Sequence, residues 1–342
     1  MTMSMPPWRT AMQGRFEELT ISSAVLEGNP LGDPSRRPLL VYLPPGYEES
    51  RHYPAIYLLQ GLTRQLDMWW NRSAFRPTVP ELIDRVFGEP DVPPCVVVLV
   101  DAWTSLGGSQ FLNSSGTGRY LDYLSDEVVA VVDERFATIP DRDHRALAGH
   151  SSGGYGAIVV SLVRPDMFGA FAAHSADALF EVCYQPEFRE AARALQGEYA
   201  GDWTAFWEDF HSRPAFSKRY DHLLLNIYCM AACYSAQPDG SPAFPFDLAT
   251  GRTRQEVWDR WLALDPVRLA SHHGDALRSM RGVYLDAGRR DEAFLDLGAT
   301  AFARELDRLG VAHHFELFDG GHGSVEYRYP LGWRYLAERL TS

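Results

Sequence analysis

The sequence contains little cysteine, no excess of basic residues and no long apolar run. Four cysteines in 342 residues are too few for a disulfide scaffold. Cys229 and Cys233 lie close together in an apolar segment but lack the further Cys or His at ligand spacing that a structural zinc site needs. A formal net charge of −13 argues against a nucleic-acid-binding surface, which needs basic side chains to neutralise phosphates. No segment approaches the roughly 18 consecutive apolar residues of a membrane helix, and residues 1–19 have no signal-peptide core. These absences predict a soluble cytoplasmic protein with no metal and no nucleic-acid or membrane partner, and they leave the oligomeric state open.

Short apolar runs bounded by turn residues recur along the chain and are typical of strands buried on both faces. They cover residues 55–60, 95–100, 145–148, 169–174, 282–287 and 314–318, after two antiparallel strands at 19–26 and 37–43. Helical spacing of apolar residues is clearest at 119–136, 292–309 and 325–340. This alternation predicts an α/β fold with a mostly parallel, eight-stranded sheet, helices on both faces, and ligands bound at the carboxyl ends of the strands.

Residues 178–265 interrupt this alternation, because they contain several helical stretches and many aromatic residues but no convincing strand. We expect them to form a helical cap inserted into a catalytic domain made of residues 1–177 and 266–342. Most of the aromatic side chains would pack the core of the cap, and a minority would line a pocket for the acyl or alcohol group of a substrate.

Gly149, Ser151 and Gly153 form a GxSxG motif within LAGHSSGGYGA, between an apolar run and a helix-compatible run. A strand that turns sharply into a helix at such a motif holds the serine in a strained conformation with its hydroxyl exposed. The motif alone is weak, because a Gly/Ser-rich turn into a helix has the same pattern. Its context makes Ser151 a candidate nucleophile.

A serine hydroxyl needs a base to take its proton, and the base needs an acid to orient it. His322 lies in FDGGHGS, directly after the last apolar run, where glycines allow a tight loop; a surface-loop histidine is the alternative interpretation. Asp291 is the expected acid, because Asp286 would lie within the sheet and Glu292 would open the next helix and favourably meet its dipole. The chain order of nucleophile, acid and histidine is that of α/β-hydrolases.

Two backbone N–H groups are expected to stabilise a substrate oxyanion. The first belongs to Ser152, at the start of the helix after the nucleophile. The second belongs to Leu62, because Gly61 before it permits a close approach of the backbone.

Four further residues are candidates for substrate contacts. Trp69 and Trp70 would wall the acyl site or plug the loop against the core. Asp101 would bind substrate or cap local backbone groups at the end of a strand. His174 would lie near the site, with a structural histidine as the alternative.

The segments that carry these residues also occur together in a known family. They are VYLPPGYEES, YPAIYLLQGLT, GRYLDYLSDEVVAVVDERF, LAGHSSGGYGA, LDAGRRDEAFL and FDGGHGSVEYR, in this order over most of the chain. In them the chain resembles the putative-esterase family, the esterase D type of α/β-hydrolase, which includes S-formylglutathione hydrolases, feruloyl and enterochelin esterases and mycolyltransferases. The resemblance implies the α/β-hydrolase fold and the same nucleophile, acid, base and oxyanion amides.

The chain also departs from members of this family. S-formylglutathione hydrolases commonly have a Cys shortly after the Gly-Leu-Thr of the third strand, whereas Arg64 follows Thr63 here. The aromatic insertion is longer than in compact members. Mycolyltransferases use Glu as the acid, so Glu292 stays an alternative to Asp291.

The sequence therefore predicts a serine esterase that cleaves a small-molecule carboxylic ester or thioester through an acyl-enzyme on Ser151, without a metal or organic cofactor. An acyltransferase that uses the same three residues is one alternative. A non-catalytic α/β-hydrolase scaffold is the other.

Overall fold

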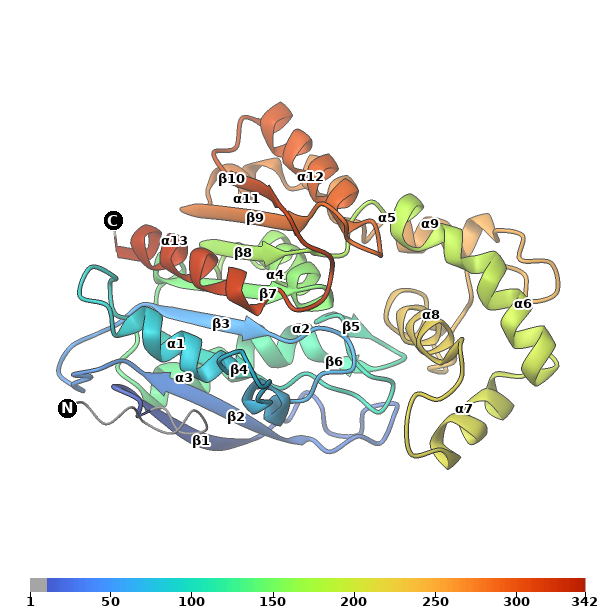
Figure 1. Ribbon diagram of the computed structural model, residues 1–342, viewed down its shortest axis with the longest axis horizontal. Helices are drawn as coiled ribbons and strands as arrows, with labels where there is room; N and C mark the ends of the chain where they lie inside the picture. The colour runs from blue at the N-terminus through green and yellow to red at the C-terminus, as the bar shows by residue number, and fades with distance from the viewer. Residues whose placement is uncertain (1–10, 342) are drawn as a thin grey trace.

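Eight strands form one sheet in the order β1-β2-β4-β3-β7-β8-β9-β10 (Figure 1). The computed structural model of the protein describes residues 11–341. Strand β2 pairs antiparallel with β1 and with β4, whereas the other neighbours in this sheet are parallel. The strands are β1 (Arg15–Ser22), β2 (Arg36–Leu43), β3 (Ala55–Leu59), β4 (Val96–Val100), β7 (Arg145–His150), β8 (Ala170–His174), β9 (Gly282–Gly288) and β10 (His314–Phe318). The predicted mostly parallel sheet of eight strands is confirmed.

Strand β1 lies at residues 15–22, whereas the sequence predicted a strand at 19–26. It is the one strand whose predicted position was clearly wrong. The apolar residue Leu26 extended the expected strand. Its side chain is buried in the core, but its N–H donates to the Ser23 hydroxyl in a turn beyond the strand. Burial therefore identified the residue correctly, and the local hydrogen bond decided its secondary structure.

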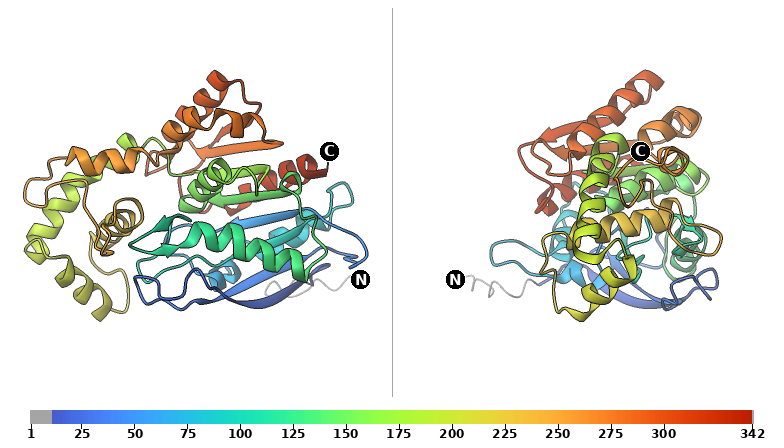
Figure 2. Two further views of the ribbon diagram at one scale, coloured as in Figure 1. Left: turned by 180° about the vertical axis from the view of Figure 1, so that it is seen from behind. Right: turned by 90° about the vertical axis from the view of Figure 1, so that its right-hand side faces the viewer.

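The sheet separates two layers of helices. Successive residues of β3 point to opposite faces, so that Tyr57 joins one apolar cluster and Leu58 the other. One face is covered by α1 (Val79–Phe87) and α13 (Tyr329–Thr341), and the other, seen from behind in Figure 2, by α3 (Val129–Arg135), α4 (Ser152–Val163) and α12 (Leu295–Leu309). Helices on both faces are thus confirmed.

The helix expected at 119–136 is divided into three parts. Helix α2 (Tyr120–Asp122) leads into a π-helical segment, η2 (Tyr123–Val128), and then into α3. Within the wide turn the Ser125 hydroxyl donates to the Leu121 carbonyl oxygen, 2.7 Å away. The spacing of apolar residues identified the buried face of this segment. The same spacing does not reveal whether a turn of the backbone is α-helical or π-helical.

Helices occupy most of the chain between β8 and β9. They are α5 (Phe180–Cys183), α6 (Phe188–Tyr199), α7 (Trp203–Ser212), α8 (Asp221–Tyr234), α9 (Gln255–Leu262), α10 (Pro266–His272) and α11 (Gly274–Arg278). Helices α6 to α9 lie to one side of the sheet (Figure 1) and share an aromatic-rich core of their own. Tyr155 and Val159 of α4, with Leu106 and Leu112 of the loop after β4, belong to the same core and connect it to the sheet.

Shorter elements complete the chain. They are the two-stranded ribbon β5 (Asn113–Ser114) and β6 (Gly118–Arg119) and the 3-10 turns η1 (Leu66–Trp70), η3 (Arg142–His144), η4 (Gln185–Glu187) and η5 (Glu326–Arg328). Residues 1–10, which include part of the segment expected to lack a signal-peptide core and the start of the expected catalytic domain, lie outside the described residues. From residue 11 to 341, no helix is long and apolar enough to cross a membrane.

Candidate active site

Ser151 occupies the sharp turn between β7 and α4. Its φ of 58° and ψ of −128° are values that a serine seldom adopts, so the turn is strained. A Cβ on Gly149 would lie 2.4 Å from the backbone of Gly153, and one on Gly153 would lie 2.2 Å from the Leu59 carbonyl oxygen. The Ser151 N–H donates to the His174 carbonyl oxygen at 3.0 Å. The motif glycines thus allow the close packing that holds the hydroxyl at the carboxyl edge of the sheet.

His322 and Asp291 complete a chain of hydrogen bonds from the serine. Ser151 Oγ lies 3.1 Å from His322 Nε2, and His322 Nδ1 lies 2.9 Å from Asp291 Oδ2. The Asp291 carboxylate is buried, and its other oxygen accepts a hydrogen bond from the Ala293 N–H at 2.9 Å. The imidazole is 28% exposed, so it faces the cavity described below. In this geometry the carboxylate fixes Nδ1 as the protonated nitrogen and leaves Nε2 to accept the serine proton.

Glu292, the alternative acid, contacts a different atom of the histidine. Its Oε2 accepts a hydrogen bond from the His322 backbone N–H at 2.8 Å. A Cβ on Gly321 would lie 2.6 Å from the Glu292 carboxylate, so the glycine before the histidine allows this contact. Glu292 therefore holds the loop, whereas Asp291 holds the ring.

Opposing effects act on the proton affinity of His322. Burial lowers its pKa, but the hydrogen bond and charge of Asp291, with the charges of Asp177 and Glu292, outweigh burial and raise the pKa above its ordinary value. The neighbouring His150 has a pKa well below its ordinary value because of burial, and its Nε2 donates to the His322 carbonyl oxygen at 3.0 Å. One imidazole is thus suited to take a proton, and the other stays neutral and positions the loop.

A cavity of about 280 Å³ opens at Ser151. Leu62 and Ser152, which were expected to supply oxyanion donors, both line it. Across the described part of the chain, neither backbone N–H has a hydrogen-bond acceptor. Two free amides beside a serine hydroxyl are the donors that a tetrahedral oxyanion requires.

The four residues expected to contact substrate lie outside this cavity. Asp101 forms a buried ion pair with Arg37 at 2.7 Å. The His174 Nδ1 lies 2.7 Å from Asp286, deep in the sheet. Both interactions follow from burial, since a charged or polar group at a strand end needs a partner once water is excluded.

The two tryptophans lie in η1, after β3, and do not line the cavity at Ser151. Trp69 is buried in the apolar cluster of α1 and α13. Trp70 is 40% exposed and packs its ring edge against Phe16, with centroids 5.1 Å apart. Trp69 lines the second cavity described below, whereas Trp70 lines neither that cavity nor the one at Ser151.

Polar residues that the sequence analysis did not single out line the cavity opposite His322. Asp177, just after β8, accepts hydrogen bonds from the Ser152 hydroxyl at 3.1 Å and from the Tyr184 hydroxyl at 2.8 Å. Glu187 accepts a long hydrogen bond of 3.4 Å from Asn226 of α8. Burial, offset in part by Asn226, raises the pKa of Glu187 to about 7. Asp177 follows β8 and Glu187 belongs to the segment 178–265; no motif marks either residue, and the fold alone brings them to the site.

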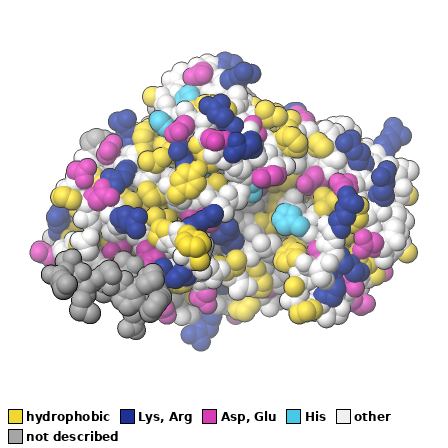
Figure 3. Space-filling model, in the orientation of Figure 1, with side chains coloured by type: hydrophobic (Ala, Val, Ile, Leu, Met, Phe, Trp, Pro, Cys, Tyr) yellow, Lys and Arg dark blue, Asp and Glu magenta, His cyan; other side chains and the backbone are white. Residues whose placement is uncertain are grey.

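No group of three or more His, Cys, Asp or Glu side chains between residues 11 and 341 is arranged to hold a metal ion. The surface charge is likewise mixed. On the face shown in Figure 3, Lys and Arg side chains are interspersed with Asp and Glu.

The sequence profile of a family described as "Putative esterase" matches residues 34–332. The chain belongs to this esterase family. A curated endo-1,4-beta-xylanase/feruloyl esterase of Xylanibacter ruminicola is 26% identical over 166 residues, which cover 47% of this chain and 22% of that protein. The S-formylglutathione hydrolase of Mus musculus is 29% identical over 179 residues, covering 50% of this chain and 60% of that protein. The match thus spans less than two thirds of the length of either relative.

The match to solved structures extends over more of this esterase-family chain than the sequence matches do. A ferulic acid esterase covers 96% of this chain and all of its own, with a TM-score of 0.61 and 21% identity. An S-formylglutathione hydrolase from Agrobacterium tumefaciens covers 97% of this chain and 98% of its own, with a TM-score of 0.58 and 17% identity. The resemblance to the α/β-hydrolase fold is therefore confirmed over the whole sheet.

Proposed function

We propose that the protein is a serine esterase in which Ser151, His322 and Asp291 form the catalytic triad. The observation that carries this proposal is the continuous chain of hydrogen bonds, 3.1 Å from Ser151 Oγ to His322 Nε2 and 2.9 Å from His322 Nδ1 to Asp291. Membership of the esterase family supports it independently. If these three side chains only stabilised the fold, they would not require a serine in a strained conformation beside two free amides at an open cavity.

Acylation begins when Ser151 Oγ attacks the carbonyl carbon of the ester and its proton passes to His322 Nε2. The carbonyl oxygen becomes negative and accepts hydrogen bonds from the amides of Leu62 and Ser152. The imidazolium is stabilised by Asp291. It then returns the proton to the leaving oxygen as the carbon–oxygen bond breaks, which releases the alcohol and leaves the acyl group on Ser151.

Deacylation repeats these steps with water. His322 takes a proton from the water as its oxygen attacks the acyl carbon, and the same amides hold the second oxyanion. The imidazolium then protonates Ser151 Oγ as the acyl bond breaks. A free acid is released and the enzyme returns to its starting state.

Residues 178–265 serve as the cap in this proposal. Tyr184, Glu187 and Asn226 come from this segment and form one wall of the cavity at Ser151. The remaining residues, 1–177 and 266–342, carry the triad and the amides. The cap therefore selects substrates, whereas the sheet performs the chemistry.

We also propose a cytoplasmic location. The four cysteines are buried free thiols, which agrees with a reducing compartment.

Pre-steady-state hydrolysis of p-nitrophenyl acetate tests the proposed reaction. Breakdown through an acyl-enzyme predicts a burst of nitrophenolate close to one equivalent per active site where deacylation limits turnover, and an active-site serine ester that mass spectrometry detects after acid quenching. His322→Ala should abolish both signals. A burst of nitrophenolate from the wild type with no acetylated serine would contradict the covalent mechanism.

A further inference from the structure

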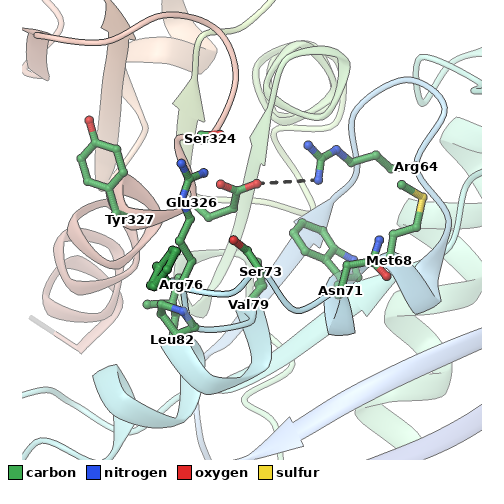
Figure 4. A pocket seen from close by; sticks show the side chains of 13 residues that line it. Arg64, Met68, Asn71, Ser73, Arg76, Val79, Leu82, Ser324, Glu326 and Tyr327 are labelled. Carbon is green, nitrogen blue, oxygen red and sulfur yellow. Dashed lines mark ion pairs between the residues drawn. The ribbon is translucent and has the colours of Figure 1, made fainter. Parts of the chain in front are cut away.

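Figure 4 shows a second cavity, of about 410 Å³, which shares Arg64 with the cavity at Ser151. Its floor is apolar and includes Trp69, with Val79 and Leu82 of α1. Its rim is formed by the loop after β3 and by the start of the segment that follows His322, through Ser324 and Tyr327.

Arg64 joins the two cavities, since it lines both of them. Its guanidinium pairs with Glu326 at 3.8 Å, with both side chains partly exposed (Figure 4). Gly323 lines the first cavity and Ser324 the second, so the loop that carries His322 also runs from one to the other. A long, partly exposed ion pair is a weak barrier between them.

Exposed apolar side chains gather at the second cavity. Phe75 is 98% exposed, Tyr327 57% and Met68 37%, and all three line it. An isolated exposed apolar residue is ordinary, but a cluster around a concave site marks a binding surface. Arg64 and Arg76 add two guanidinium groups, which stack favourably on electron-rich rings. These walls fit an aromatic ligand.

The direction of the reaction assigns this ligand to one side of the ester. His322 returns its proton to the leaving oxygen, so the leaving alcohol must lie on the side of the histidine loop. That loop continues from His322 into the wall of the second cavity.

On the basis of the esterase function proposed above, we propose that the second cavity binds the alcohol portion of the substrate and that this alcohol carries an aromatic ring. Phe75 and Tyr327 flank the ring, and Arg64 lies between it and the reacting carbonyl. Binding of this remote portion is used to position the ester at Ser151.

Two esters that carry the ring on opposite sides of the carbonyl test this assignment. The substrates are 3-phenylpropyl acetate, its counterpart methyl 3-phenylpropanoate, and methyl acetate as the reference without a ring. In the wild type, kcat/KM for 3-phenylpropyl acetate should exceed that for methyl acetate. Phe75→Ala should lower kcat/KM for 3-phenylpropyl acetate about 3- to 10-fold, mainly through KM, and leave methyl acetate unchanged.

Phe216→Ala is the matched control, because Phe216 is 54% exposed and does not line either cavity. It should alter none of the three rates. The proposal is overturned if Phe75→Ala changes hydrolysis of methyl 3-phenylpropanoate instead, which would assign the cavity to the acyl group, or if it changes no substrate. These outcomes differ from a failure of the proposed esterase function itself. In that case neither the wild type nor any variant would hydrolyse methyl acetate.

Discussion

Ser151 and His322 are 171 residues apart in the chain, yet Ser151 Oγ lies 3.1 Å from His322 Nε2. Parallel strands β7 and β10 place the loops that carry them at the same edge of the sheet, and β9 places Asp291 at that edge as well. The carbonyl oxygen of His322 is held by His150, the residue directly before the serine. The fold therefore fixes the proposed base to the proposed nucleophile through backbone as well as side-chain contacts.

Replacing each of the two acidic residues after β9 by its amide, one at a time, should separate their roles. Asp291→Asn should lower kcat about 10³- to 10⁴-fold, because the amide no longer holds His322 in the productive tautomer. Glu292→Gln keeps an acceptor for the His322 N–H and should cost less than about 10-fold. Steady-state hydrolysis of p-nitrophenyl acetate measures both, and a larger loss in Glu292→Gln would make Glu292 the acid.

The pH dependence of kcat/KM should follow the protonation of His322. The base works only when neutral, so activity falls as the pH drops through its pKa, which lies above the ordinary value of His. In Asp291→Asn the charge and hydrogen bond that raise this pKa are lost, so the acid limb of the residual activity should move to lower pH. An unshifted acid limb would show that another group controls it.

Gly153→Ala should destabilise the protein, since its Cβ would lie 2.2 Å from the Leu59 carbonyl oxygen, a backbone atom of β3. We expect a loss of at least about 2 kcal/mol in the free energy of unfolding, measured by urea denaturation. Gly197→Ala in α6 is the control, because a Cβ there meets no atom within 4 Å. It should stabilise the protein by about 0.5–1 kcal/mol through the higher helix propensity of Ala. Equal stability of the two variants would contradict the account of the turn.

Glu187 should make stability depend on pH. Burial raises its pKa to about 7 in the folded protein, above the ordinary value of 4.5, so the unfolded chain releases this proton first and stability decreases between about pH 4.5 and 7. Glu187→Gln should remove this decrease, which amounts to no more than about 3 kcal/mol. The variant minus wild-type difference in unfolding free energy, measured at pH 5 and pH 8, should therefore grow with pH. Glu256→Gln, at an exposed position of α9 that does not act on Glu187, should show no such growth.

The sequence predicts the sheet and the geometry around Ser151 well, for a physical reason. Buried parallel strands require continuous apolar runs, and a sharp strand-to-helix turn requires glycines at fixed spacing, so both leave a local pattern. Asp177 and Glu187 leave none. Each is a carboxylate in a loop or short turn. Asp177 reaches the cavity from the end of β8, and Glu187 reaches it from η4 of the helical segment 178–265.

The misplaced residues show the same limit. Asp101 and His174 stand at strand ends, as catalytic groups do, but Arg37 and Asp286 occupy their polar atoms. Partners so distant in sequence cannot be found from local pattern. At the second cavity the sequence analysis named Trp69 but missed Phe75, because an aromatic residue looks like a core residue until its 98% exposure is known.

Labelling with a fluorophosphonate, followed by peptide mapping, tests the central claim most directly. A nucleophilic serine activated by His322 should be phosphonylated once per chain, on the peptide that contains Ser151, and Ser151→Ala should fold normally but take up no label. Ester hydrolysis should disappear in the same variant. Labelling of a different serine, or hydrolysis that survives in Ser151→Ala, would contradict the account.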